Sequence, residues 1–329
     1  MKGAISKLAL LAATVAALPV SDIEERQVSN AKKPKTQAIT DAQILNYALT
    51  LEHLEDTFYK QGLQNFTQAQ FAAAGYDATF YKNLQEISSD EATHVSFLTS
   101  ALSGAGASPV AACTYNFGVT SVQSFIATAN LLEGVGVSAY LGAAQNITNK
   151  AYLTAAGAIL TVEARHSAYL RASETPEGTL SPFPSPFDTP LDFDEVYSLA
   201  SQFIASCPSS NAPLPVKAFP ILSLTGSAAP TNGTSSNAKA AGIVPVATGS
   251  TITLSLAKGA FSGQVQVAWI TVTGPIFADA TIVNGGKSIT SVVPSGIAGQ
   301  SYVVALPCGQ TIVTDDNILA GPAIVEVSD

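Results

Sequence analysis

The chain has 329 residues, of which 47% are hydrophobic and 12% are charged, and its 24 acidic and 15 basic side chains give a formal net charge of −9. This composition excludes a disordered, charge-rich chain, and the length favours two domains over one. The acidic balance and the lack of a basic stripe argue against nucleic acid as a partner, because phosphate binding begins with positive charge.

Residues 1–18 have the pattern of a secretory signal peptide. Lys2 and Lys7 precede an apolar run over residues 8–18, which is too short to span a bilayer. We therefore expect an extracellular or cell-wall protein with no membrane span, in which residues 19–39 form a flexible leader. Export would also allow N-glycosylation at three N-x-S/T sequences, whose acceptor residues are Asn65, Asn146 and Asn232.

The three cysteines allow one disulfide in an exported protein. Cys113 and Cys207 each lie just past a predicted helix or in its connecting loop, so this pair is favoured. Cys308 would then be left over. A link between Cys207 and Cys308 is the alternative.

Residues 40–207 follow helical periodicity. The spacings Thr40-x-x-Gln43 and Thr120-x-x-Gln123 are capping boxes that would begin the first and third helices. The connection over residues 103–119 is long enough to run the length of a bundle, which predicts two helical pairs joined by a crossover. The pattern predicts helices at about residues 40–62, 77–102, 120–144, 149–172 and 189–206.

Residues 208–329 have a different texture. After a linker rich in Pro, Ser, Thr and Gly, apolar and polar residues alternate, and Asn284-Gly285-Gly286 has the composition of a hairpin turn. This region contains no histidine and no recognisable catalytic constellation. We expect a small β-sandwich. The clearest strand patterns are residues 251–256, 264–269, 281–283, 288–290, 301–306 and 323–327.

The helical region contains a repeated Glu-x-x-His spacing. Residues three apart share one face of a helix, so each Glu–His pair can bind a metal ion from the same side. The first and third helices each carry a glutamate among apolar residues, where a carboxylate is costly to bury unless it is paired or metal-bound. The candidate metal ligands are Glu52, Glu91, His94, Glu133, Glu163 and His166.

These ligand types also indicate the metal. Four carboxylates and two imidazoles suit two Fe or two Mn ions, which accept oxygen ligands and leave positions open for a small molecule. Zinc prefers fewer ligands with more nitrogen or sulfur. The sequence therefore predicts two Fe or two Mn ions per chain.

Two tyrosines repeat the same spacing. Tyr59 follows Glu52 by seven residues, and Tyr140 follows Glu133 by seven. Seven residues are about two helical turns, so each tyrosine projects near the face of its glutamate and can hydrogen-bond a ligand carboxylate across the bundle. This repeat is the reason for choosing Glu52 as the ligand over Glu55.

Other polar residues nearby receive simpler interpretations. His53 is expected at the surface or the edge of the bundle. Glu55, Glu86 and Asp90 are expected to be solvated or structural.

The segment Ala48-Leu49-Thr50-Leu51-Glu52-His53-Leu54-Glu55, together with Asp90-Glu91-Ala92-Thr93-His94 and Glu163-Ala164-Arg165-His166, resembles the ferritin-like superfamily. More narrowly, the chain resembles secreted fungal stress-response and sexual-development proteins that carry a ferritin-like domain. The likeness is close over about residues 40–206, and all six ligand positions of the superfamily pattern are occupied. It implies a four-helix bundle with a di-metal site and leaves the substrate and the reaction open.

Two functions fit these patterns. One is an exported di-metal oxidoreductase of peroxidase, catalase or oxidase type that acts on peroxide or O2. The alternative is a structural or cell-surface protein, in which the bundle is a metal-stabilised scaffold and the β-domain contacts the cell wall or a partner. Iron storage is disfavoured, because N-x-S/T sequences in the helix connections and a large second domain would hinder packing into a shell.

Overall fold

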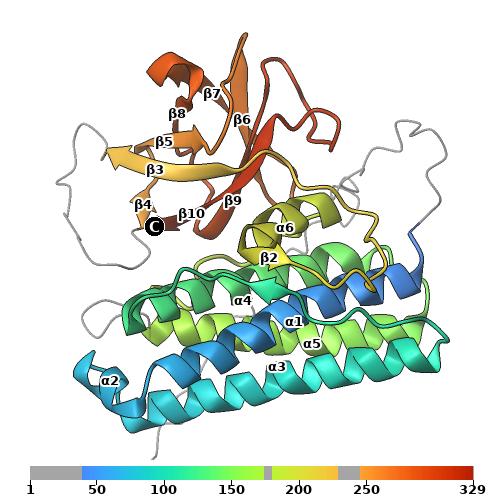
Figure 1. Cartoon of the computed structure of the whole chain (residues 1–329). Coiled ribbons are helices and arrows are strands. Elements are labelled where there is room, and N and C mark those ends of the chain that lie inside the picture. Colours follow the sequence, from blue (N-terminus) through green and yellow to red (C-terminus); the bar gives the residue numbers. More distant parts are fainter. Residues whose placement is uncertain (1–38, 174–179, 229–244, 329) are drawn as a thin grey trace, which may run out of the picture.

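The structure, a computed structural model, describes residues 39–173, 180–228 and 245–328. The predicted signal peptide, the leader up to residue 38 and Asn232 lie outside these residues. A helical region comes first and a β-rich region follows, which confirms the predicted order of the two parts (Figure 1).

The helical region is a bundle of four long helices. Helix α1 packs against α3, α4 packs against α5, and α1 also contacts α4, so that two helical pairs form one bundle. The capping box predicted at Thr40 and Gln43 is present at the start of α1. The four helices are α1 (Asp41–Asn65), α3 (Ala78–Gly104), α4 (Val122–Ala144) and α5 (Lys150–Ser173).

Two predicted helix boundaries were wrong, the end of the first long helix and the start of the third. Helix α1 continues past Gly62 to Asn65 and is followed by a short helix, α2 (Gln68–Ala73), that the pattern did not indicate. Helix α4 begins one residue later than expected, with Ser121 as N-cap. The reciprocal pair is Ser121 and Ser124 in place of Thr120 and Gln123, because Ser124 accepts hydrogen bonds from the backbone N–H groups of both Thr120 and Ser121.

The fifth predicted helix is much shorter than residues 189–206. Helix α6 spans Phe193–Ala200 and begins at a capping box formed by Asp192 and Glu195. A 3-10 turn ends it, and strand β2 (Ile204–Ser206) then pairs with β1 (Thr114–Tyr115) in the crossover between α3 and α4. The backbone partners that β1 offers explain why these residues leave the helix.

A disulfide between Cys113 and Cys207 lies directly beside the β1–β2 pair. It ties the crossover to the segment that follows α6. Cys308 is exposed and free.

Removing this disulfide is expected to destabilise the protein. It closes a sequence separation of 94 residues, and the loop entropy restored to the unfolded chain corresponds to about 4 kcal/mol. We therefore expect Cys113→Ser/Cys207→Ser to lower the denaturant midpoint, measured by circular dichroism. Cys308→Ser is the matched control and should leave the midpoint unchanged; equal effects of the two changes would contradict this account.

The β-rich region is one continuous sheet of eight strands in the order β3-β5-β8-β7-β6-β9-β10-β4. Strands β3 and β10 lie near opposite ends of this order and still contact each other, so the sheet curls into a barrel-like form in place of two stacked layers. The strands are β3 (Leu222–Ala228), β4 (Val246–Ala247), β5 (Thr251–Leu256), β6 (Val265–Ile270), β7 (Ile276–Val283), β8 (Ser288–Val292), β9 (Gly299–Pro307) and β10 (Ala320–Ser328).

The predicted hairpin turn is confirmed. Strands β7 and β8 pair antiparallel on either side of Asn284-Gly285-Gly286. All three residues have positive φ, at 53°, 65° and 89°. Asn and Gly tolerate this left-handed backbone better than other residues, which is why the composition alone predicted the turn.

The two regions share a packed interface (Figure 1). The Tyr302 hydroxyl on β9 donates to the Gly134 carbonyl at 2.9 Å and accepts from Ser138 Oγ at 3.0 Å, both on α4. Arg171 on α5 forms a buried two-pronged ion pair with Glu326 on β10, at 2.9 and 2.6 Å. Buried polar contacts as well as apolar packing therefore join the bundle and the sheet.

Candidate metal centre

The six predicted ligands come from the four long helices and meet inside the bundle. Glu52 lies on α1, Glu133 on α4, and the two Glu-x-x-His pairs lie on α3 and α5. All four glutamates are 0% exposed, and the two histidines are 8% and 6% exposed. The residues are Glu52, Glu91, His94, Glu133, Glu163 and His166.

His94 faces one half of this cluster. Its Nδ1 atom lies 3.2 Å from Glu52 Oε2 and 3.3 Å from Glu91 Oε2. The same atom lies 3.5 Å from Glu163 Oε1. These four residues place one ligand atom each within 4.8 Å of one another.

His166 faces the other half. Its Nδ1 atom lies 3.1 Å from Glu91 Oε1 and 3.2 Å from Glu133 Oε2. Glu91, Glu133, Glu163 and His166 form a second group with ligand atoms within 4.8 Å of one another. Glu91 and Glu163 belong to both groups, so the two halves are adjacent and share two carboxylates.

The cluster fits metal ions better than it fits protons alone. Four of its buried oxygen atoms have no partner with hydrogen-bond geometry in the described part of the chain: Glu52 Oε2, Glu91 Oε1 and both oxygens of Glu163. Three of these oxygens lie 3.1 to 3.5 Å from a histidine Nδ1 atom, and only Glu163 Oε2 has no such contact among the described residues. Burying several carboxylates this close together is strongly unfavourable, and coordination to a cation removes the cost. The buried Glu and His side chains can therefore hold metal.

The pKa values of the glutamates also reflect the cost of burying several carboxylates together. Burial raises the pKa of Glu52 to about 7 and the pKa of Glu163 well above its usual range. Burial also acts on Glu91, but hydrogen bonds and charge from His166 and His94 outweigh it and lower the pKa of Glu91 to about 2.

The histidines change in the complementary direction. Burial alone would lower their pKa values, but the neighbouring glutamates outweigh burial and raise the pKa of His94 to about 10 and that of His166 to about 11. Without a bound cation, protons would balance part of the carboxylate charge.

Each tyrosine contacts a glutamate of the other helical pair. The Tyr59 hydroxyl on α1 donates to Glu133 Oε1 at 2.5 Å. The Tyr140 hydroxyl on α4 donates to Glu52 Oε1. Both rings are buried, so the two hydrogen bonds fix the carboxylates from opposite sides of the cluster.

Two residues near the cluster have more specific positions than the sequence indicated. Asp90 is half-exposed, but its Oδ2 atom lies 3.1 Å from His166 Nε2. Glu55 was expected to be solvated or structural; it is 4% exposed and lies beside the charges of the cluster, so it is not solvated. The available signal was its spacing, since Glu55 lies three residues after Glu52 and shares its helix face.

The remaining predicted positions are peripheral to the cluster. His53 is half-buried and lies 3.1 Å from the Val110 carbonyl through Nε2, and Glu86 is exposed. Asn65 is exposed at the end of α1, and Asn146 is half-buried in the turn after α4.

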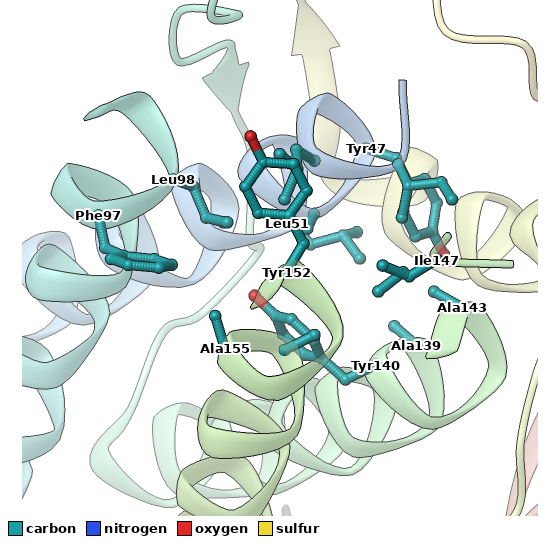
Figure 2. A pocket seen from close by; sticks show the side chains of 14 residues that line it. Tyr47, Leu51, Phe97, Leu98, Ala139, Tyr140, Ala143, Ile147, Tyr152 and Ala155 are labelled. Carbon is teal, nitrogen blue, oxygen red and sulfur yellow. The ribbon is translucent and has the colours of Figure 1, made fainter. Parts of the chain in front are cut away.

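A small apolar cavity lies beside the Tyr140 hydrogen bond. Its volume is about 20 Å³, and side chains from all four long helices converge on it (Figure 2). Tyr140 and Leu51, the neighbour of Glu52, both line it. The space suits about one water-sized molecule, and its carbon-lined wall favours an apolar one.

Residues 40–175 match the ferritin-like domain family. With the four-helix arrangement and the buried Glu/His cluster in place, this match decides the assignment. Residues 40–175 form a ferritin-like domain.

The chain is also similar to a curated fungal protein. Protein rds1 of Schizosaccharomyces pombe is 30% identical over 194 residues, which cover 59% of this chain and 46% of rds1. The matched segment thus spans about half the length of that relative. Within the described residues, none of the helices is both long and apolar enough to cross a membrane.

Proposed function

We propose that this chain is a secreted ferritin-like protein that binds two Fe or two Mn ions and acts on peroxide or O2 in stress response or development. The observation that carries the proposal is the pair of overlapping ligand groups that share Glu91 and Glu163. All four carboxylates are buried, and Glu163 Oε2 has no hydrogen-bond or ion-pair partner among the described residues, so the groups favour cation binding. Bound Fe or Mn would supply one-electron chemistry toward the oxidant.

The surrounding residues would hold the ligands in place. The hydroxyls of Tyr59 and Tyr140 fix the outer carboxylates, Glu133 and Glu52. The Nε2 atom of His166 faces Asp90, so a proton held there leaves the Nδ1 lone pair directed into the cluster. The apolar cavity beside Tyr140 offers space for a small oxidant.

The test is elemental analysis followed by turnover. Native protein purified from the culture medium should contain about two Fe or Mn ions per chain, and the loaded protein should consume hydrogen peroxide or O2. Glu91→Ala/His94→Ala is the control and should abolish both. Metal-free native protein, or loaded protein that consumes neither oxidant, would refute the proposal.

Secretion and glycosylation belong to the same proposal. Asn65 is exposed, as a glycan acceptor must be. Recovery of the protein from the medium, without residues 1–18 and with a glycan mapped to Asn65 by mass spectrometry, is the expected result.

The second candidate is a cell-surface protein in which the bundle is a metal-stabilised scaffold for the β-domain. The buried Arg171–Glu326 ion pair and the Tyr302 hydrogen bonds favour it, because they couple the two regions mechanically. On this account Glu91→Ala lowers thermal stability while binding to isolated cell walls survives.

A further inference from the structure

A larger pocket lies between the bundle and the sheet. Its volume is about 500 Å³, within the range typical of small-molecule sites. Apolar side chains of α1 and α4 line one wall, among them Leu51, Leu132 and Val135, and β3 and β10 contribute Leu222 and Ile324 to the other. We refer to this space as the interdomain pocket.

Glu55 is the acidic group at the bundle wall of this pocket. It lines the pocket, yet its side chain is 4% exposed, so it lies deep within it. Glu326, the other acidic residue of the lining, is already paired with Arg171. No described residue forms a hydrogen bond or ion pair with Glu55, whose interactions are with the charges of Glu91, Glu52 and Glu133.

Gly136 lies where the interdomain pocket comes nearest to the metal-binding cluster. A Cβ atom at this position would lie 3.1 Å from Glu55 Oε1 and 3.4 Å from Glu163 Oε2. Gly136 also lines the pocket. Because it has no side chain, α4 places no atom beyond its backbone between these two carboxylates.

We propose that the interdomain pocket binds a small organic molecule with a largely apolar body and one hydrogen-bond-donating group, an amine or hydroxyl, that faces Glu55. The volume and the apolar walls fit the body, and the unpartnered carboxylate fits the donor. This inference rests on the proposed function, because it makes the molecule the organic substrate of the adjacent cluster.

The test uses two fluorescent probes of similar size with the full chain. N-Phenyl-1-naphthylamine carries one N–H donor, and 1-benzylnaphthalene carries none. Each probe is titrated into the protein, and its fluorescence is excited in that probe's own absorption band. Wild-type protein should bind the amine saturably at one site per chain and at least about tenfold more tightly than the hydrocarbon, as a buried hydrogen bond to a carboxylate predicts. Glu55→Leu should remove this preference.

Two variants block the pocket from opposite walls. Thr128→Trp on α4 and Ser223→Trp on β3 both alter lining residues and should each weaken amine binding at least about tenfold. Thr161→Trp, at an exposed position of α5 outside the lining, is the matched control. If one blocking variant fails to fold, as judged by its melting curve, the other supplies the test.

Metal content measured on the same samples separates the two proposals. Two ions per chain without saturable probe binding would overturn the proposed binding by the interdomain pocket and would leave the proposed metal site unaffected. Probe binding that the blocking variants do not weaken, or a preference for the amine that survives Glu55→Leu, would also overturn it. Saturable, blockable binding by a protein without metal would refute the proposed function and leave the pocket as a binding site.

Discussion

Replacing Glu91 by alanine is expected to reduce the bound Fe or Mn from about two ions per chain to less than one. Glu91 directs one oxygen toward His94 and the other toward His166, and it belongs to both ligand groups. Its loss therefore removes a ligand from each half at once. Metal content, measured by plasma mass spectrometry after loading and desalting, checks this.

The same variant should lose the stabilisation that metal confers on the wild type. At a free metal concentration about 100 times the dissociation constant, binding contributes about 3 kcal/mol to the free energy of unfolding. Glu86→Ala, at an exposed position on the same helix, is the matched control and should keep both the metal and the stabilisation. Full metal content in Glu91→Ala would show that the two halves do not depend on a shared carboxylate.

Metal-free protein is expected to lose stability as the pH rises from about 5 to 8. The pKa of Glu52 is about 7 in the folded protein and 4.5 in its ordinary state. The folded state thus binds more protons in this interval, so the free energy of unfolding falls as the pH rises, by on the order of 3 kcal/mol for this carboxyl group.

The histidines act in the same direction at higher pH. Their pKa values are raised to about 10 and about 11, so the stability they contribute is fully present below their ordinary value of 6.5 and is lost above it. The pKa of Glu91 is lowered to about 2. Its contribution to the free energy of unfolding is therefore present above pH 4.5 and is lost as the pH falls below that value. Maximum stability of the metal-free protein should therefore lie near pH 5.

Urea unfolding at pH 5, 6.5 and 8 checks this expectation, with ionic strength held constant. Glu52→Gln, which cannot ionise, should make the profile less steep between pH 5 and 7, and the remaining slope comes from groups such as Glu163 whose pKa is also raised. Metal should reverse the trend, because ligand groups must release protons to coordinate it. A flat wild-type profile across this interval would mean that the cluster does not hold protons in place of metal.

Much of the helical half was predictable because its signals are local. Caps and apolar periodicity place the start of α1 at Thr40 without reference to any distant residue. The Glu-x-x-His spacing likewise puts Glu91 and His94 on one helix face, since the spacing and the helix geometry are both local. Export, glycosylation and the identity of the metal stay predictions.

The errors occurred where distant segments compete with local preference. Residues 204–206 continue an amphipathic pattern, yet they pair with β1 because Thr114 and Tyr115 offer backbone partners across the chain. The sequence left Glu55 as either solvated or structural, and the packing of α4 and the sheet against α1 decides between the two by burying it. Neither the strand pairing nor the burial can be predicted from the residues within one helical turn.

Local sequence patterns were enough to identify the residues that can carry the chemistry and the helix faces on which they lie. Only the packing of the helices and the sheet shows that Glu91 and Glu163 are shared between two groups and that a pocket beside Glu55 lies between the two regions. The reason is physical. Helical spacing is set by bonds within four residues, whereas burial and the meeting of charges depend on which helices and strands pack together.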